Sequence, residues 1–382
     1  MMSPLGLTNK TMRERSIHLR RVSEFVHRVI WNCLGFGIWA PGLLRRGGIG
    51  FRLLQVGALS VLLLLASWAA GFFAEAQTSL KKASFIPQWV PQAQFAGYYV
   101  AFEKGFYRNR GIDLTILQGG PDHSAGDYLE SGKADFASLW LSAGIQKRSR
   151  GAKLVNVAQI MQRSALMLVA KKSRGIREPK DISGKKVGLW GADFQVQPRA
   201  FFKKYHLGVQ VIPQSFSVNL FLRDGVDVAS AMWYNEYHTI LNSGLNPDEL
   251  TAFFFYDHGL NFPEDGIYAL EETFHKAPAL SCAFVRATAG GWSYAFDHPD
   301  EALDIVLNYM AQAKIPANRM HQKWMLNRMK DLISSPDHGG RMGMLEPSDY
   351  QRVAAELKQS GLVGRIPDYR SFFVGCGDRA EE

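Results

Sequence analysis

The chain has 382 residues, of which 47% are hydrophobic and 21% are charged. This is an ordinary globular composition with room for two domains. The formal net charge is +9, but residues 1–76 hold nine Lys and Arg against three Asp and Glu, so most of the excess lies in that leader and gives no reason to expect a nucleic-acid partner.

The leader has the layout of an export signal. Three arginines, the last of them Arg52, precede an uncharged run from Leu53 to Phe73, and the small-x-small pattern ends at Ala76. We expect the leader, residues 1–76, to be cleaved there. Because the apolar run is also long enough to span a bilayer, an uncleaved membrane anchor is the alternative. Either interpretation places the rest of the chain in the periplasm.

Beyond Lys82 the hydrophobic pattern alternates between strands and helices. A strand is expected over 83–89 and an amphipathic helix over 96–111. Further strands are expected at 112–117, 134–139, 154–161, 165–172, 185–190, 209–214, 226–233 and 250–256. From Ala277 onward the pattern is mostly helical. This alternation predicts an α/β protein with parallel sheets.

The expected strands fall into two runs, which predict two α/β lobes. We expect lobe one to contain 83–165 plus 266–382 and lobe two to contain 166–265. Ligands of open α/β sheets bind at the carboxyl ends of the strands, so two facing lobes make a ligand cleft there. Hinge closure around a ligand is the expected behaviour of such a pair of lobes.

Aromatic residues gather where this cleft is expected. Four of the nine tryptophans end or directly follow an expected strand: Trp89, Trp140, Trp190 and Trp233. Gln92 and Gln94 add amide donors and acceptors beside the first of them. An aromatic face with amides at its rim suits a flat ligand with polar edges. The alternative, a Trp89 ring packed in the core with the two glutamines capping the next helix, is left equally open.

Polar residues follow two further strands. Tyr234, Asn235 and Glu236 come directly after the strand at 226–233, and a carboxylate there can accept from an exocyclic amine. Glu236 can also be read as a first-turn helix residue favoured by the helix dipole. Gly119 and Gly120 precede another expected helix and could present backbone N–H groups to an anion, although a plain turn is the favoured interpretation.

Motifs of catalysis and metal binding are missing from the sequence. There is no Walker-type loop, HExxH, CxxC or GxSxG motif, and no two His are four residues apart. We therefore expect no metal and no cofactor. Cys282 and Cys376 follow the leader, and the sequence leaves open whether they pair.

A family resemblance adds to this interpretation. The segments WVPQAQFAGYYVAFEKGFYRNRGIDLTILQGGP, SGKADFA, VGLWG, MWYNEY and EDGIYAL together resemble the periplasmic substrate-binding proteins for thiamine pyrimidine precursors. Their broader group binds sulfonates, nitrate, taurine and riboflavin and includes the thiamine pyrimidine synthase. The resemblance, over about 84–375, implies a two-lobed type II binding-protein fold, a heterocyclic ligand, an ABC permease as partner and no catalysis. The family's stacking and ring-edge roles fall on Trp89, Tyr234 and Glu236. We expect a monomer.

The synthase of the same family is the enzymatic alternative. It uses pyridoxal phosphate held by a Lys, with a His four residues further on. Aligning its Gly-Lys-x-Asp stretch on 132–135 places Leu139 at the Lys position and Ala143 at the His position. Leu139 can form no Schiff base and Ala143 can move no proton, so we expect no synthase activity.

The exact ligand stays open at this stage. The pyrimidine binders commonly have Asn and His where this chain has Gln94 and Phe95. Riboflavin or another flat heterocycle therefore remains an alternative to an aminopyrimidine. An anion such as a sulfonate ranks lower, because it needs less aromatic surface than the strand-end tryptophans offer.

Overall fold

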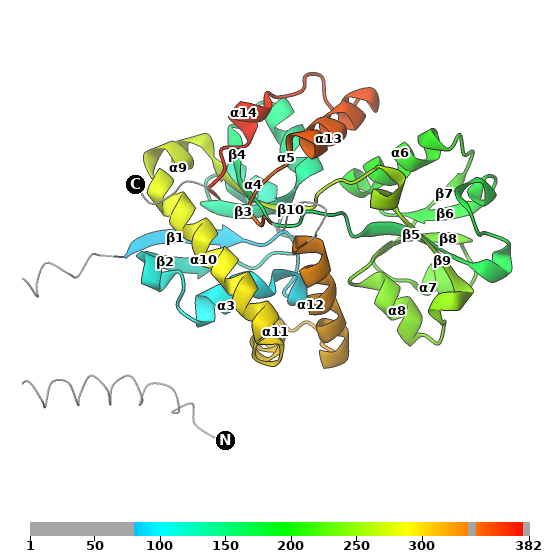
Figure 1. Cartoon of the computed structure of the whole chain (residues 1–382), viewed down its shortest axis with the longest axis horizontal. Helices are drawn as coiled ribbons and strands as arrows, with labels where there is room; N and C mark the ends of the chain where they lie inside the picture. Colours follow the sequence, from blue (N-terminus) through cyan, green and yellow to red (C-terminus); the bar gives the residue numbers. More distant parts are fainter. Residues whose placement is uncertain (1–79, 335–340, 377–382) are drawn as a thin grey trace, which may run out of the picture. The chain divides into compact units, whose positions relative to one another are not determined.

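The computed structural model describes residues 80–334 and 341–376, so the expected leader with its apolar run lies outside the described residues. Within the described ranges, no helix is long and apolar enough to cross a membrane. The described chain forms two five-stranded sheets, and we call each sheet with the helices packed on it a lobe (Figure 1). The two-lobed α/β fold expected from the sequence is thus confirmed.

Lobe one contains the first four strands and the last one. Its strand order is β2-β1-β3-β10-β4. The bounds are β1 Lys81–Ile86, β2 Ile112–Ile116, β3 Phe136–Trp140, β4 Leu154–Gln159 and β10 Asp265–Leu270. β1 runs parallel to β2 and β3, whereas β10 lies antiparallel between β3 and β4. The first residue of β10 therefore lies at the carboxyl end of β3, where ligands of such sheets bind.

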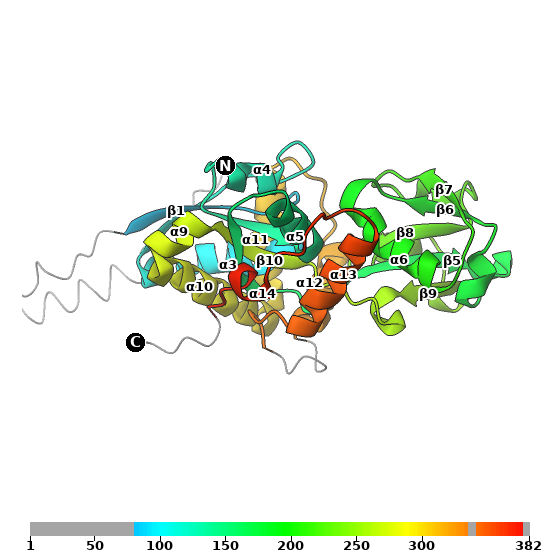
Figure 2. The same cartoon turned by 90° about the horizontal axis from the view of Figure 1, so that it is seen from above.

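Lobe two contains the five middle strands in the order β7-β6-β8-β5-β9. They are β5 Leu166–Lys171, β6 Lys186–Leu189, β7 Gln210–Pro213, β8 Val228–Met232 and β9 Leu250–Phe254. β6 is parallel to β7 and β8, and β5 is antiparallel to β8 and β9. This sheet is seen from a second direction in Figure 2.

Three expectations about the strands are corrected. The sheets are mixed rather than parallel, because β5 and β10, which come first after each crossing between the lobes, run against their neighbours. Strand β10 adds to the nine expected strands, and its sequence DGIYAL lies at the expected crossing from lobe two back to lobe one. Strand β1 ends at Ile86, so Trp89 lies three residues beyond it in a loop rather than ending the strand.

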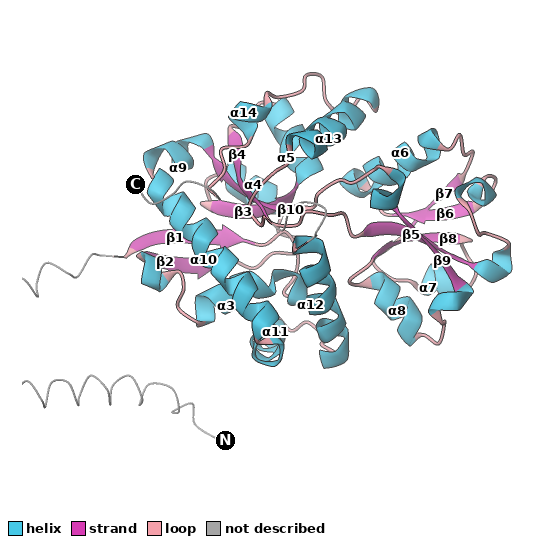
Figure 3. Cartoon of the chain, viewed as in Figure 1, coloured by secondary structure: helices cyan, strands magenta, loops and turns pink. Residues whose placement is uncertain are grey.

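Helices cover both sheets (Figure 3). On lobe one they are α3 Ala96–Glu103, α4 Ala125–Glu130, α5 Leu141–Ser149, α9 Glu271–Lys276, α10 Pro278–Asp297, α11 Pro299–Gln312, α12 Arg319–Ile333, α13 Pro347–Gln359 and α14 Tyr369–Phe372. On lobe two they are α6 Val196–Lys204, α7 Asn219–Leu222 and α8 Glu236–Asn242. Short 3₁₀ turns lie at 93–95, 108–110, 172–174, 179–182, 192–195, 247–249 and 255–258.

The long helix α10 organises the core of lobe one. Its Phe284 stacks on Phe136 of β3, with ring centroids 4.3 Å apart and planes 6° apart. Where α10 crosses α3, a Cβ on Gly291 would lie 2.1 Å from the carbonyl oxygen of Gly97. Glycine at position 291 therefore lets the two helix backbones approach closely, and any larger residue would push them apart.

The structure resolves the question about the cysteines. Cys282 of α10 and Cys376 form a disulfide that closes a loop across 94 residues. The backbone N–H of Cys376 also donates to the carbonyl oxygen of Val157 in β4, 3.0 Å away. The C-terminal segment is thereby fastened both to the long helix and to the edge strand of lobe one.

We predict that the disulfide is a main source of stability. Changing both Cys282 and Cys376 to Ala should lower the free energy of unfolding by about 2–4 kcal/mol, because the unfolded chain regains the freedom of a long loop. Denaturant titration followed by circular dichroism measures this. Reducing agent should destabilise the unaltered protein by a similar amount and leave the double variant unaffected. Equal denaturation midpoints for the oxidised and reduced protein would contradict the prediction.

Candidate functional site

A cavity of about 600 Å³ is lined by residues of both lobes. Nine of the ten residues expected to bind a ligand line it: Trp89, Gln92, Gln94, Gly120, Trp140, Trp190, Tyr234, Asn235 and Glu236. Gly119 does not. It packs on the loop after β1, where a Cβ would lie 1.9 Å from the carbonyl oxygen of Pro87. The cavity is within the size range of sites that enclose small organic ligands.

Aromatic side chains from opposite lobes meet across the cavity. Trp89 of lobe one contacts Phe216 of lobe two edge to face, with centroids 4.8 Å apart. Phe194 of lobe two contacts Trp140 of lobe one at 4.7 Å and Trp190 of its own lobe at 5.5 Å. Both phenylalanines were missed from the sequence. The available signal was their place in the loops that follow the strands expected at 185–190 and 209–214.

One of the strand-end tryptophans turns away. The ring of Trp233 packs on Phe254, 5.4 Å away, and under the guanidinium of Arg328, and Trp233 is not among the residues lining the cavity. The expectation that strand-end tryptophans face the cleft therefore fails here, because successive side chains at a strand end point in opposite directions. Its neighbour Tyr234 takes the cavity side.

A buried carboxylate holds the glutamines of the cavity wall. Asp265, the first residue of β10, pairs in register with Trp140 and is 3% exposed. Gln94 Nε2 donates to Asp265 Oδ2 at 2.7 Å, and Gln88 Nε2 donates to the other oxygen. Gln92 Nε2 donates to Gln94 Oε1 at 2.6 Å. The amide of Gln94 is therefore oriented from both ends, which neither the glutamine positions nor their spacing indicated.

Burial also changes how this carboxylate titrates. It raises the pKa of Asp265 to about 7, against the opposing effect of the hydrogen bonds from Gln94 and Gln88. Near neutral pH the group that anchors the wall is thus divided between its charged and neutral forms.

Glu236 is a first-turn helix residue that also lines the cavity. It begins helix α8, with 7% of its surface exposed. Its Oε2 accepts from the backbone N–H of Met232 at 3.0 Å, and its Oε1 accepts from Asn235 Nδ2 at 2.8 Å. Burial raises the pKa of Glu236 to about 7, and these hydrogen bonds act against the rise. The backbone N–H of Glu236 also bonds to this carboxyl group, and one of its four lone-pair sites remains for a ligand.

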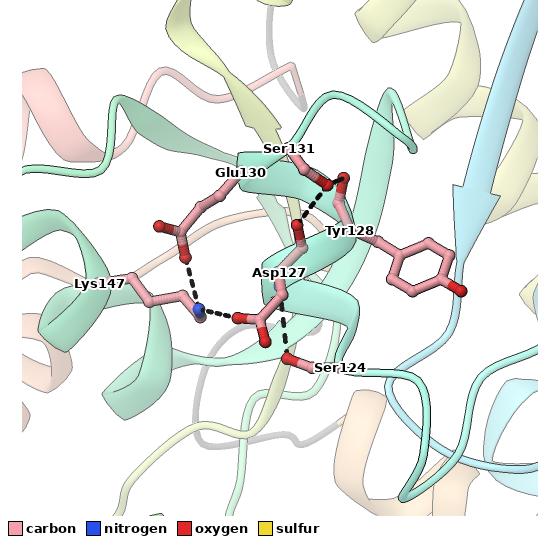
Figure 4. Close-up of polar contacts among 6 residues, drawn as sticks. All are labelled: Ser124, Asp127, Tyr128, Glu130, Ser131 and Lys147. Carbon is pink, nitrogen blue, oxygen red and sulfur yellow. Dashed lines mark hydrogen bonds and ion pairs between the residues drawn. The ribbon is translucent and has the colours of Figure 1, made fainter.

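Lys147 on α5 is the one cation among the described residues that line the cavity, and it was not expected from the sequence. Its Nζ lies 2.9 Å from Asp127 and 2.5 Å from Glu130 on α4 (Figure 4). Burial lowers the pKa of Lys147, but the bonds to these two carboxylates outweigh burial and leave it raised. The positive charge is therefore compensated within the protein.

The N-terminus of α4 is capped by one of the protein's own side chains. Ser124 Oγ accepts from the backbone N–H of Asp127 at 3.3 Å, also drawn in Figure 4, and Ser124 is the N-cap of this six-residue helix. Neither Asp122 nor His123 occupies the N-cap position. His123 instead lies with its Nδ1 3.3 Å from the hydroxyl of Tyr128. Residues 119–124 therefore form a turn that leads into a capped helix, which agrees with the plain turn favoured from the sequence.

The two positions aligned with the synthase both line the cavity. Leu139 lies on β3 and Ala143 on α5, and neither side chain carries a nucleophile or a base. Within the described residues, no group of three or more His, Cys, Asp or Glu is placed to hold a metal ion. The cavity thus offers aromatic surface, amides and carboxyl groups, and these can bind a ligand by stacking and hydrogen bonding.

The segments that cross between the lobes are joined by a buried network. Glu264 Oε1 accepts from the backbone N–H groups of Ala165 and Leu166 at 2.6 and 3.0 Å and from Ser164 Oγ at 3.0 Å. Asn261 Oδ1 accepts from the backbone N–H of Ser164 at 3.0 Å. Burial, followed by the neighbouring Asp265, raises the pKa of Glu264 to about 8. The crossing segments therefore share one carboxyl group that prefers its neutral form.

The chain is similar in sequence to one protein family and to several known proteins. The family model described as NMT1/THI5 like matches residues 92–302. A riboflavin-binding protein, RibY, of Chloroflexus aurantiacus is 26% identical over 343 residues, covering 85% of this chain and 96% of that protein. A formylaminopyrimidine-binding protein of Halalkalibacterium halodurans is 22% identical, covering 75% and 89%. A 4-amino-5-hydroxymethyl-2-methylpyrimidine phosphate synthase of Schizosaccharomyces pombe is 23% identical, but over only 40% and 42%.

Solved structures show the same fold. The periplasmic aliphatic sulphonate binding protein SsuA of Escherichia coli superposes with a TM-score of 0.61, covering 77% of this chain and 97% of that one, at 15% identity. At that identity the likeness concerns the fold. The chain thus has the periplasmic binding protein fold that the resemblance implied.

We predict a pH dependence of stability that comes from Glu264. Its folded pKa lies above the ordinary value of 4.5, so the folded state holds a proton that the unfolded state has released. The stability it contributes is complete below about pH 4.5 and is lost as the pH rises through about 8. In Glu264→Gln this contribution to the pH dependence of the free energy of unfolding should disappear. Denaturant titrations between pH 4.5 and pH 8 measure it. Glu272→Gln, at an exposed carboxylate, is the control. Parallel pH profiles for Glu264→Gln and the unaltered protein would contradict the assignment.

Proposed function

This chain belongs to the NMT1/THI5-like family, and on that premise we propose that it is an extracytoplasmic solute-binding protein that passes a flat heterocycle to an ABC permease. The observation that carries the proposal is the cavity itself, in which aromatic side chains of the two lobes meet in pairs. Closing the lobes on a planar ring would place aromatic surface on both of its faces. Stacking of this kind is worth about 1–3 kcal/mol per ring.

An aminopyrimidine fits the polar part of the cavity. The carboxyl group of Glu236 lines it and has a pKa raised to about 7. As a carboxylate it accepts a hydrogen bond from an exocyclic amine, and as a carboxylic acid it can donate to the adjacent ring nitrogen as well. An amine next to a ring nitrogen is the edge that an aminopyrimidine presents. The relative named for formylaminopyrimidine supports this ligand class.

Riboflavin is the second candidate. The riboflavin-binding relative is matched along more of both chains than the pyrimidine-binding one. A cavity of about 600 Å³ with two cross-lobe aromatic contacts also has room for a larger ring system. The two candidates share the stacking and differ in size and in the edge that they present to Glu236.

The charges of the cavity favour a neutral ligand over an anion. Lys147 is compensated by Asp127 and Glu130, and Glu236 and the nearby Asp265 are carboxyl groups. A sulfonate would have to be bound without an uncompensated cation and would be repelled by the ionised forms of both carboxyl groups. For the synthase reaction, Leu139 and Ala143 lack the chemical groups that the resemblance requires, and the synthase relative matches less than half of this chain.

The proposed location outside the cytoplasm has a structural support besides the expected leader. Cys282 and Cys376 form a disulfide. Disulfides persist in oxidising compartments such as the periplasm and are rare in the cytosol. Part of the proposal is therefore that residues 1–76 direct export, with cleavage after Ala76 or with Leu53–Phe73 as an anchor.

We predict that stacking and the carboxyl group both contribute to affinity. Trp89→Ala should weaken binding of formylaminopyrimidine by roughly 10- to 100-fold, since it removes one aromatic face. Glu236→Ala should have a similar effect, because a charged hydrogen bond is worth about 1.5–3 kcal/mol. Glu236→Gln should be milder, since the amide can still accept and donate. Isothermal titration calorimetry measures these affinities.

The controls use matched residues away from the cavity. Phe102→Ala removes an exposed aromatic ring from α3, and Glu272→Gln neutralises an exposed carboxylate on α9. Neither should change the affinity. The same titrations with riboflavin and with an alkanesulfonate distinguish the ligand classes. Tight alkanesulfonate binding that is indifferent to Glu236 would sink the heterocycle proposal, and consumption of pyridoxal phosphate would show that the protein is an enzyme.

A further inference from the structure

Helix α12 of lobe one contacts helix α8 of lobe two, whose first residue, Glu236, lines the cavity. His321, Trp324 and Arg328 recur at spacings of three and four residues on α12, so they share one face of the helix. All three are half-buried, whereas Lys323 and Asn327 between them are exposed. This face was not singled out by any sequence motif.

The face of α12 formed by His321, Trp324 and Arg328 packs on the turn between β8 and α8. Trp324 Nε1 donates to the carbonyl oxygen of Trp233 at 3.0 Å. The guanidinium of Arg328 lies 4.6 Å from the ring centre of Trp233 and 4.8 Å from that of Trp324, within cation–π range. The imidazole of His238 stacks on Trp324, with centroids 4.8 Å apart and planes 14° apart. These contacts join the two lobes directly.

His321 links this contact to a residue that lines the cavity, Asn235. Its Nδ1 lies 2.9 Å from Nδ1 of His238, and its Nε2 lies 2.8 Å from Oδ1 of Asn235. Asn235 Nδ2 in turn donates to Glu236 Oε1 at 2.8 Å. Because the carbonyl oxygen of an amide only accepts, His321 must donate from Nε2. That bond fixes which end of the Asn235 amide faces Glu236.

We propose that His321 is a positioning residue of the cavity: it latches lobe one to His238 of lobe two and, through Asn235, orients the Glu236 carboxyl group only while the lobes are closed. The inference rests on the proposed function in taking this cavity as the ligand site. It makes lobe closure and the recognition of the ligand's edge one event. Opening would release the Asn235 amide, so the open protein would present Glu236 in a less defined geometry.

The two histidines make the latch sensitive to acid. With Nε2 of His321 committed as a donor, a neutral pair is satisfied when Nδ1 of His238 donates to Nδ1 of His321. The pair can also hold one added proton. His321 then donates from both nitrogens and His238 Nδ1 accepts, which is compatible with the donor Asn242 Nδ2 at 3.2 Å from His238 Nδ1. Two added protons would set two N–H donors against each other at 2.9 Å. The latch should therefore break as the second proton binds.

The surrounding groups agree with this direction. Burial lowers the pKa of His238, and burial followed by the charge of His238 lowers the pKa of His321. The charged groups linked to the pair by contacts are Glu236 on α8, through Asn235, and Arg328 on α12, through the Trp324 ring. Arg319, at the start of α12, is paired with Asp304 of α11. Because opening would return both imidazoles to water, the lowered pKa values of His238 and His321 favour the closed form above pH 6.5. They oppose the closed form as the pH falls below that value.

Small-angle scattering of the protein without ligand tests the latch. The unaltered protein should have a smaller radius of gyration at pH 7.5 than at pH 5.0. His321→Ala should show the larger radius at both values. His321→Gln, whose amide can still donate to Asn235 but does not titrate, should stay compact at both. His298→Ala, at an exposed imidazole stacked on Tyr294, is the matched control and should behave like the unaltered protein. An unchanged radius and pH profile in His321→Ala would overturn the proposal.

A second measurement needs no variant. The imidazole resonances of His238 and His321 should titrate as a coupled pair, and two independent titrations at the ordinary histidine pKa would overturn the latch.

Binding of two probes, formylaminopyrimidine and riboflavin, completes the test. His321→Ala should bind the recognised probe about tenfold more weakly at pH 7.5, and His321→Gln should recover most of that loss. An acid-dependent radius in a protein that binds neither probe would support the latch and overturn only the proposed ligand class. Full affinity for a probe in His321→Ala would overturn the positioning role.

Discussion

The buried carboxyl group of Asp265 is the contact on which the cavity wall depends. Strand β10 runs antiparallel between β3 and β4, which brings its first residue to the carboxyl end of β3, opposite Trp140. From there Asp265 accepts from Gln88 and Gln94, and Gln94 accepts from Gln92. Burying a carboxylate is unfavourable unless it is hydrogen-bonded, so these bonds and the conformation of the loop after β1 stabilise each other. The loop in turn presents Trp89 to the other lobe.

The charges around the cavity are balanced within the protein. Lys147 is held between Asp127 and Glu130, while burial raises the pKa of Glu236 and of Asp265 to about 7 and that of Glu264 to about 8. An anionic ligand gains little from such a site, since the one cation among the described lining residues, Lys147, is already paired with two carboxylates. Its affinity has to come from aromatic contact and from directional hydrogen bonds, which is how a flat, uncharged heterocycle is recognised.

The two lobes are joined at several kinds of contact. Trp89 with Phe216 and Trp140 with Phe194 meet across the cavity, Glu264 ties the crossing segments, and the face of α12 grips the corner at Trp233. The β8–α8 corner belongs to two of these sets, because Tyr234 and Glu236 line the cavity while Trp233 and His238 meet α12. A movement of the lobes therefore changes the cavity wall and the α12 contact together.

The sequence by itself determined the elements and much of the cavity lining. Alternating apolar stretches located nine of the ten strands, and residues at or just after strand ends, such as Trp140 and Glu236, do line the cavity. Those features are local, since they depend on periodicity and on the position of a residue within its own strand. Strand direction, the insertion of β10, the Cys282–Cys376 pair, and the meeting of Phe216 with Trp89 or His321 with His238 were decided only by the tertiary structure. The physical reason is that each of these joins residues far apart in the chain, and no local pattern specifies which distant partner a side chain will meet.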